Sequence, residues 1–282
     1  MPKPLDTELD AIAARLRACD RVLLLSDFDG TLVPIHEHPA ECFLDPNVGA
    51  ALSSLAGRER ISIGVVSGRR LQDLKSRVGL DGLTYVGNHG LECDGPEMSF
   101  LEAADAQSTK ALRDVIYELA ASIFLIPGAW IEDKGLTASV HYRQVAAEWI
   151  PALLETVQRI VGRELEERRI VLRYGKKVIE VRPAVPWNKG TAVQRIFDHR
   201  RNRNSNKLLI YFGDDETDED VFRAFRGGVT VSVGDRPGTF ANFTARAPSC
   251  VHGFVAWMSN VLMTSEQDSW KQTIGRFDRR TF

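Results

Sequence analysis

The chain has 282 residues, of which 44% are hydrophobic and 26% charged, and its formal net charge at pH 7 is −2. This length suits two compact domains or one large α/β domain, and the composition is that of an ordinary globular protein. The near-neutral charge gives no reason to expect nucleic acid or an anionic membrane as a partner, and the sequence contains no apolar run as long as a membrane span.

The N-terminal segment and the cysteines bear on location. Residues 1–20 carry acidic and basic side chains among the apolar ones, which is unlike a signal peptide. The four cysteines lie far apart and form no CxxC pair, which argues against a zinc cluster or a disulfide framework. These features predict a cytoplasmic protein.

Short apolar strands alternate with amphipathic helices along most of the chain. Helices are expected at residues 71–78 and 189–197. This alternation predicts a doubly wound, mostly parallel, Rossmann-like α/β core, in which ligands bind beyond the carboxyl ends of the strands. The predicted strands are residues 21–26, 61–67, 207–212 and 229–233.

The middle of the chain follows a different pattern, in which each helix precedes a pair of strands. Pro183 and Pro186 mark the end of this region. The order αββαββ predicts a small α+β domain with an antiparallel sheet, inserted into the core. Its predicted elements are a helix at 107–122, strands at 129–133 and 136–143, a helix at 147–161, and strands at 169–174 and 177–182.

The predicted domain division follows from this insertion. Residues 1–106 form the first part of the core, residues 107–184 the inserted domain, and residues 185–282 the second part of the core. The polar and basic stretch 200–207 is expected to be a solvated loop rather than a nucleic-acid patch.

Two carboxylates follow the first predicted strand, in the segment Asp27-Phe28-Asp29-Gly30-Thr31. If the backbone stays extended there, Asp27 and Asp29 point to the same side. One carboxylate can then attack phosphorus while the other protonates the leaving oxygen and later activates water. The alternative interpretation is a helix cap or an Asx-turn.

A second acidic segment follows the strand at 207–212 and has five acids in the six positions 214–219. Acids this close repel one another unless a cation or hydrogen-bond donors compensate, and Mg²⁺ is a suitable cation. The alternative is that these acids cap the next helix. Metal binding and capping are compatible if Thr217 and Asp218 cap the helix while Asp214 binds the metal.

A phosphoryl group also needs hydrogen-bonding and positively charged partners. Ser67, Gly68 and Arg69, at the end of the second strand, offer a hydroxyl and flexible amides. Lys189 begins a predicted helix, where a positive charge is unfavourable for the helix dipole unless an anion or an acid cluster lies nearby.

These segments, DFDGT, SGR, the isolated Lys189 and GDDETDE, resemble in this order the four motifs of the haloacid-dehalogenase (HAD) superfamily of phosphatases. The resemblance extends over residues 22–261, and finer features are similar to trehalose-6-phosphate phosphatases. It implies a HAD core in which the αββαββ insertion is a cap domain that closes over substrate. The finer features are DFDGTLVPI, VVSGR, GNHGLE, GKKVIEVRP ahead of WNKG, and GDDETDEDVF.

The resemblance implies a reaction and the residues that perform it. The reaction is hydrolysis of trehalose-6-phosphate to trehalose and inorganic phosphate, in trehalose biosynthesis, through a phospho-aspartyl intermediate. Asp27 would be the nucleophile and Asp29 the general acid/base. Ser67 and Lys189 would hold the transferring phosphoryl group.

The resemblance also implies a magnesium cofactor. Mg²⁺ would be held by Asp27, the backbone carbonyl of Asp29, and Asp214. Asp215 or Asp218 would support this site through hydrogen bonds or water.

Substrate specificity is expected to come from polar residues of the insertion. The two hairpin turns are quasi-equivalent in the αββ repeat, so both can face the core, and charged side chains there suit the many hydroxyls of two glucose rings. The alternative is that these are solvated hairpin residues. The residues predicted to bind substrate are Gly68, Arg69, Asn88, His89, Glu132, Lys134 and Glu180; His141 and Arg143 are weaker candidates.

Other functions remain open at this stage. The same chemistry would serve another sugar phosphate, such as sucrose phosphate or mannosyl-phosphoglycerate, or a phosphomutase that passes the phosphoryl group to a sugar. A non-enzymatic alternative is a silent subunit that binds a sugar phosphate or a trehalose-phosphate synthase. The complete set of catalytic residues argues against it.

Overall fold

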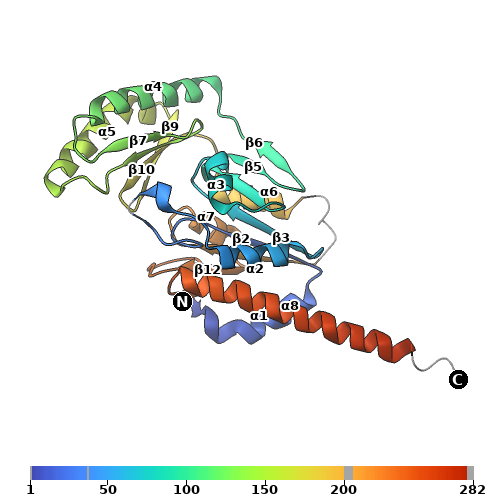
Figure 1. Ribbon diagram of the computed structural model, residues 1–282. Helices are drawn as coiled ribbons and strands as arrows, with labels where there is room; N and C mark the ends of the chain where they lie inside the picture. Colours follow the sequence, from blue (N-terminus) through green and yellow to red (C-terminus); the bar gives the residue numbers. More distant parts are fainter. Residues whose placement is uncertain (1, 37, 200–205, 278–282) are drawn as a thin grey trace.

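The computed structural model describes residues 2–36, 38–199 and 206–277, and side chains as far as residue 262 (Figure 1). Most of the polar stretch predicted as a solvated loop, residues 200–205, lies outside the described residues. Among the described helices, none combines the length and the hydrophobicity needed to cross a lipid bilayer.

The described residues form one large sheet and one small sheet. In the large sheet the central strands run parallel, and antiparallel pairing occurs only among the last three strands at one edge. The order in space is β1-β13-β12-β11-β2-β3-β4-β5-β6. Its strands are β1 (Lys3–Pro4), β2 (Arg21–Ser26), β3 (Ile61–Val66), β4 (Thr84–Gly87), β5 (Glu92–Asp94), β6 (Ser99–Leu101), β11 (Lys207–Gly213), β12 (Val229–Val233) and β13 (Phe243–Ala245).

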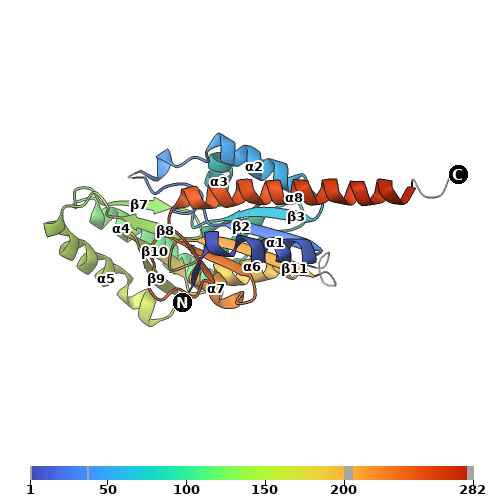
Figure 2. The ribbon, with the colours of Figure 1, turned by 90° about the horizontal axis from the view of Figure 1, so that it is seen from below.

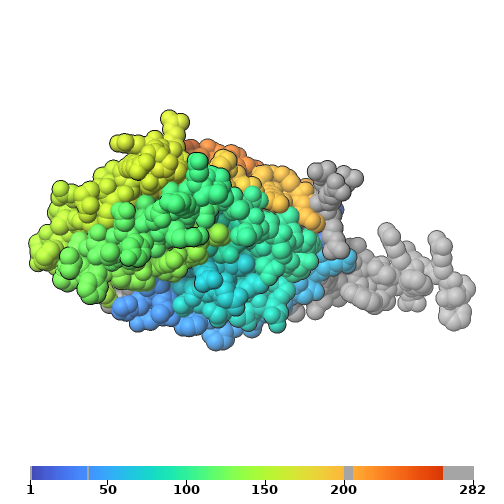
Figure 3. Space-filling model, turned by 90° about the horizontal axis from the view of Figure 1, so that it is seen from above, coloured from blue at the N-terminus to red at the C-terminus, as the bar shows by residue number. Residues whose placement is uncertain are grey.

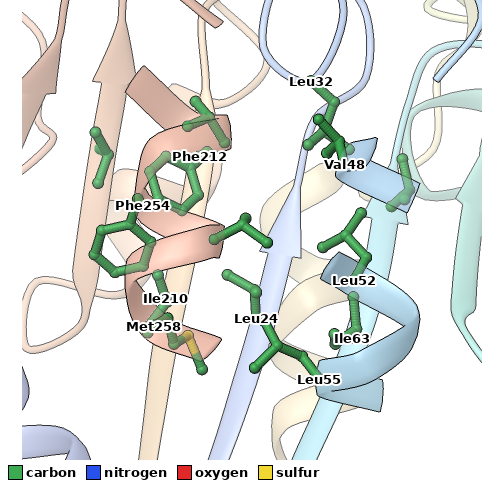
Figure 4. Packing of buried hydrophobic residues seen from close by; sticks show 14 of the residues in the cluster. Leu24, Leu32, Val48, Leu52, Leu55, Ile63, Ile210, Phe212, Phe254 and Met258 are labelled. Atoms are coloured by element: carbon green, nitrogen blue, oxygen red, sulfur yellow. The ribbon is translucent and has the colours of Figure 1, made fainter. Parts of the chain in front are cut away.

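The large sheet is covered by helices on both faces. This is required because apolar side chains along β2 point alternately to one face and to the other. Leu24 belongs to the hydrophobic cluster of one face, and Leu23 and Leu25 to that of the other. One face packs against α1 (Leu9–Ala18), α2 (Pro46–Ala56), α3 (Leu71–Val78) and α8 (Pro248–Phe277) (Figure 2). Figure 4 shows the side chains of α2 and α8 packed over this face. The other packs against α6 (Lys189–Phe197) and α7 (Glu219–Ala224). The predicted doubly wound, mostly parallel core is confirmed.

The small sheet is antiparallel, and its strands lie in the order β7-β8-β10-β9. Two helices cover its outer face, away from the core (Figure 1), over a separate hydrophobic cluster. The αββαββ order is therefore as predicted. Its elements are α4 (Ala106–Ile123), β7 (Trp130–Asp133), β8 (Ala138–His141), α5 (Ile150–Glu166), β9 (Ile170–Gly175) and β10 (Val178–Pro183).

The inner face of the small sheet carries a row of polar residues. Cross-strand pairing sets Glu132 beside Ser139, Ser139 beside Glu180, and Glu180 beside Arg173. Figure 3 shows the insertion, green to yellow-green, lying directly against the core. The predicted domain limits, at residues 106/107 and 184/185, remain a prediction.

Some elements differ from the sequence prediction. The strand expected at 136–143 is shorter, because its first residues belong to the hairpin turn, where Lys134 N donates to Thr137 O. The helix expected from 147 begins as the short 3-10 helix η4 (Ala147–Trp149). Further 3-10 helices are η1 (Leu5–Glu8), η2 (Pro39–Glu41) and η3 (Asn88–Gly90).

Candidate active site

The predicted chemical residues meet at one edge of the large sheet. Asp27 follows β2, Ser67 follows β3, and Asp214 follows β11. These three strands are neighbours and run parallel, so their carboxyl ends open at the same edge. The hydrogen bonding between β2 and β11 extends to the first residue after β2, because Asp27 N donates to Phe212 O at 2.8 Å. The edge therefore brings together side chains from distant parts of the chain.

The turn after β2 is shaped by Gly30. Its φ is +90°, and a Cβ there would lie only 2.4 Å from Asp214 Oδ2, so no side chain fits. The next residue, Thr31, donates from Oγ1 to Asp214 Oδ1 at 3.3 Å. The first acidic segment thus packs directly against the second.

Lys189 lies at the centre of the acidic groups. Asn188 caps the start of α6 by accepting from Thr191 N, and this fixes Lys189 in the first helical turn. Its Nζ donates to Asp27 Oδ1 at 2.7 Å and to Asp218 Oδ1 at 2.8 Å. The side chain is only 1% exposed. The acidic partners that the sequence analysis required for a lysine at this position are present.

Asp218 does not cap α7, contrary to the sequence expectation. Its Oδ1 accepts from Lys189 Nζ and, at 2.6 Å, from Tyr211 OH. Its Oδ2 accepts from the backbone N–H groups of Asp214 and Asp215, each at 3.0 Å. Asp218 therefore binds the loop and Lys189 together. Sequence reasoning offered capping as one role for this residue, because it precedes a helix, and support of the metal site as another.

The buried acids carry more negative charge than the nearby lysine compensates. Burial, with repulsion from Asp214 and Asp215, raises the pKa of Asp218 to about 7. The pKa of Asp27 is also raised, by burial and by the neighbouring acids against the opposing charge of Lys189. Burial likewise raises the pKa of Asp214.

A divalent cation fits this cluster. Oxygen atoms of Asp27, Asp214 and Asp218 lie within 4.8 Å of one another. Crowded carboxylate oxygens are the ligands that Mg²⁺ prefers. Asp215 is not one of the three, and its Oδ1 accepts from Thr217 N and Oγ1. The donor set therefore suits a hard cation at the ends of β2 and β11.

Asp29 is held by Arg69 in a bidentate ion pair. Arg69 Nη2 lies 2.6 Å from Asp29 Oδ1, and Nε lies 2.7 Å from Oδ2. Arg69 also donates to Asp73 at 2.9 Å and to Pro39 O at 2.9 Å. The Asp29 carboxylate is 34% exposed. The guanidinium predicted to bind substrate is thus engaged in orienting Asp29.

Ser67 and Gly68 form a floor next to Asp27. Ser67 is 2% exposed, and its Oγ accepts from Arg69 N at 3.2 Å. A Cβ on Gly68 would lie 2.2 Å from His89 Cε1, so the imidazole packs directly over this glycine. His89 is held in a left-handed conformation, with φ +56°. Glycine is required at 68 because the ring occupies the space of its missing side chain.

The hairpin turns of the insertion reach the core. Lys134 Nζ donates to Gly68 O at 3.0 Å and to Glu180 Oε1 at 3.2 Å. From the second turn, Lys176 Nζ donates to Asp214 Oδ2 at 2.7 Å. Both turns therefore face the core, as the repeat predicted.

Between the two sheets lies a cavity of about 200 Å³. Glu132, paired with His141 Nε2 at 2.9 Å, and Glu180 line its upper wall. Asn88 does not line it: its side chain accepts from Thr137 and donates to Glu92, and its role in sugar binding remains a prediction. The predicted site residues that line it are Asp27, Asp29, Ser67, Gly68, Arg69, His89, Glu132, Lys134, Glu180, Lys189, Asp214 and Asp215.

Sequence reasoning missed several lining residues. Trp130 stacks on His141, with ring centroids 4.0 Å apart, and Ser139 Oγ donates to Glu180 Oε1 at 2.8 Å. Trp130 lies two positions before Glu132 on β7, and Ser139 lies two positions before His141 on β8. Because residues two apart on a strand share a face, this spacing could have identified both. Cys42, far from any motif, carried no such signal.

Comparisons with known proteins show the family to which the chain is similar. A family model described as trehalose-phosphatase matches residues 25–242. The trehalose-phosphate phosphatase of Mycobacterium avium (strain 104) is 35% identical over 251 residues, which cover 85% of this chain and 62% of that protein. The chain therefore spans about three fifths of the length of the first curated relatives it matches.

Two solved structures are similar throughout. The C-terminal domain of the Candida albicans trehalose-6-phosphate phosphatase has a TM-score of 0.78 at 23% identity, covering 92% of this chain and 98% of that one. A trehalose-6-phosphate phosphatase related protein has a TM-score of 0.71 at 27% identity, covering 86% and 99%. The first of these, at its low identity, speaks for the fold alone.

Proposed function

Because the chain belongs to the trehalose-phosphatase family, we propose that it hydrolyses trehalose-6-phosphate to trehalose and inorganic phosphate. The observation that carries the proposal is the buried contact of Asp27 with Lys189, at the floor of a cavity roofed by polar side chains of the insertion. The reaction would serve trehalose biosynthesis.

In the first step Asp27 attacks the phosphorus atom of the substrate. A bond forms between a carboxylate oxygen of Asp27 and phosphorus, and the bond from phosphorus to the sugar oxygen breaks. Asp29 enters this step protonated, as the second step leaves it, and donates that proton to the sugar oxygen, so trehalose leaves as a neutral alcohol. Arg69 orients the carboxyl group when Asp29 is ionised.

In the second step Asp29 removes a proton from water. The oxygen of this water attacks phosphorus, and the bond to Asp27 breaks, which regenerates the carboxylate and releases phosphate. Lys189 and the hydroxyl of Ser67 hold the phosphoryl oxygens throughout. Lys189 also offsets the charge of Asp27 while the phosphate anion approaches.

We assign Mg²⁺ to the acid cluster as the resident cofactor. Asp27, the backbone carbonyl of Asp29, and Asp214 would hold it, with Asp215 or Asp218 in support. When bound, it would offset the negative charge of the carboxylates and of the phosphoryl oxygens. The three clustered carboxylates support this assignment, and a bound cation would oppose the burial that raises the pKa of Asp27 and Asp214.

The disaccharide would lie against the inner face of the insertion. Glu132, Lys134 and Glu180 present charged groups there, and sugar hydroxyls hydrogen-bond well to such groups. Closure of the insertion over substrate would exclude water from the phosphoryl group. Small-angle scattering with and without a phosphate analogue tests that closure.

A panel of sugar phosphates, assayed for phosphate release with Mg²⁺, tests the substrate. We expect trehalose-6-phosphate to have the highest kcat/KM. Equal turnover of sucrose phosphate or mannosyl-phosphoglycerate would contradict the assignment, and transfer of the phosphoryl group to a second sugar would identify a phosphomutase.

Two further proposals concern the location of the protein and its partner. The free thiols of Cys19, Cys42, Cys93 and Cys250 suit a reducing compartment, such as the cytoplasm. A trehalose-phosphate synthase is a sensible partner because it would supply the substrate. Co-purification of the full chain with a synthase tests this.

A further inference from the structure

The loop after β4 is fixed on the loop after β3 and reaches the insertion. Asn88 N donates to Arg69 O at 2.7 Å, and His89 N donates to Ser67 O at 3.0 Å. Asn88 is completely buried, and its φ is +46°, a conformation that asparagine tolerates better than most residues. The backbone of Asn88 is therefore held by the segment that also supplies Ser67 to the site.

The partners of Asn88 determine which way its amide points. Its Nδ2 donates to Glu92 Oε1 at 2.7 Å, and an ionised carboxylate can only accept. Glu92 Oε1 is itself held, since it also accepts from Leu71 N at 2.7 Å. Asn88 Oδ1 therefore faces the insertion, where Thr137 Oγ1 donates to it at 2.6 Å. The core thus presents a fixed acceptor to the hydroxyl of Thr137.

Thr137 closes the hairpin turn that carries Lys134. Lys134 N donates to Thr137 O at 3.0 Å, and Asn88 Nδ2 also donates to Lys134 O at 3.4 Å. Thr137 is completely buried, so water can replace Asn88 as the partner of its hydroxyl only if the turn separates from the core. Asn88 therefore clamps both ends of the turn.

The same segments of insertion and core meet again inside the Asp27 cavity. There Lys134 Nζ donates to Gly68 O at 3.0 Å and to Glu180 Oε1 at 3.2 Å. The flexible stem of a lysine does not by itself fix its ammonium, so the position of this group depends on where the backbone is held. The clamp at Asn88 holds that backbone against the loop that contains Gly68.

We propose that Thr137 and Asn88 are positioning residues, which set the Lys134 ammonium for contact with the sugar part of the substrate. This inference rests on the proposed hydrolysis and deepens it, because it names residues that control how the insertion meets a disaccharide. Neither residue lines the Asp27 cavity, so both act through Lys134. The alternative is that Thr137 only stabilises the fold, in which case its loss affects every substrate alike.

Kinetics with two substrates separate these roles. Thr137→Val keeps the shape of the side chain and removes the hydroxyl. We expect KM for trehalose-6-phosphate to rise about two- to tenfold, the effect of one lost hydrogen bond, with kcat/KM for p-nitrophenyl phosphate unchanged. Thr137→Ser, which retains the hydroxyl, should restore the KM. Equal losses for both substrates overturn the proposal.

Matched variants keep this test interpretable. Thr109→Val, also in the insertion, removes an exposed hydroxyl that donates to Ala104 O, and it should change neither substrate's kinetics. Thr137→Ala also lacks the hydroxyl and replaces Thr137→Val if that variant folds poorly.

A double-mutant cycle tests whether Thr137 acts through Lys134. In the Lys134→Met background the ammonium is already absent, so Thr137→Val should cause no further rise in KM for trehalose-6-phosphate. If the two increases multiply instead, Thr137 acts independently of Lys134 and the proposal is wrong.

Hydrogen exchange of the full chain, without substrate, tests the clamp apart from the reaction. The amide of Lys134 reports the turn, because it donates to Thr137 O. Its exchange should be about two- to tenfold faster in Thr137→Val than in the wild-type chain and Thr137→Ser. Unchanged exchange overturns the proposal. Faster exchange in a chain that does not hydrolyse trehalose-6-phosphate would support the clamp and contradict only the proposed function.

Discussion

Lys189 Nζ and Asp27 Oδ1 lie 2.7 Å apart, although 162 positions separate the two residues. Both side chains are almost completely buried, at 1% and 7% exposure. Burial of either charge alone would be strongly unfavourable, so each depends on the other and on Asp218. The nucleophile and its counter-charge are therefore assembled only when the whole core has folded.

Lys189→Met should destabilise the chain strongly. It leaves Asp27 and Asp218 buried without their cation, which costs about 3–5 kcal/mol when one member of a buried pair is removed. Urea unfolding measures this. The control is Lys110→Met, which breaks an exposed pair with Asp114 and should cost less than about 1 kcal/mol. Equal stability of the two variants would contradict the account.

Arg69→Lys separates two roles for this arginine. Lysine retains the charge but cannot form the bidentate pair with Asp29, so proton transfer should slow. We expect kcat to fall by about tenfold or more, with little change in KM. Arg77→Lys is the matched control, because Arg77 pairs with Asp73 without contacting Asp29. A raised KM at unchanged kcat would show instead that Arg69 binds substrate.

Lys134→Met should affect only substrates that carry the disaccharide. Its ammonium joins Glu180 at the cavity roof to the backbone Gly68 O at the floor. We expect KM for trehalose-6-phosphate to rise about 10- to 100-fold, as for the loss of one charged hydrogen bond. Kinetics with p-nitrophenyl phosphate provide the comparison. A parallel loss for both substrates would place Lys134 in the phosphoryl site.

His89 should make the protein less stable in mild acid. Burial, with the nearby charge of Arg182, lowers its pKa from 6.5 to about 3. Between these two pH values the imidazole binds a proton in the unfolded chain but not in the folded chain. The free energy of unfolding therefore decreases as the pH falls below 6.5. The slope is at most about 1.4 kcal/mol per pH unit.

The variant His89→Asn tests this, because asparagine tolerates the left-handed backbone at that position. Unfolding free energies at several pH values should show a shallower slope in the variant than in the wild-type chain. Parallel curves would mean that His89 titrates normally in the folded state.

Much of the core was predictable because its signals are local. The strands that precede Asp27 and Asp214 are apolar runs followed at once by acids, and parallel strands bring such ends together. The hairpins around Lys134 and Lys176 were likewise marked by turn residues between alternating runs. Each of these predictions needed only a few consecutive residues.

Other contacts depend on the register between strands, which no local pattern contains. Ser139 reaches Glu180 only because β8 pairs with β10 in one alignment. Asp218 accepts from Tyr211 and Lys189 instead of capping α7, since the buried lysine offers a charged donor. Sequence spacing predicted its location but not its partners.

The most direct test of the proposed reaction is to trap the phosphorylated enzyme. The full chain is mixed with trehalose-6-phosphate and Mg²⁺, quenched in acid within milliseconds, and digested for mass spectrometry. We predict that the peptide containing Asp27 carries the mass of one phosphoryl group, and that Asp27→Asn, although folded, carries none and releases no phosphate. Rapid hydrolysis with no label at Asp27, or full activity in the Asp27→Asn variant, would contradict the account.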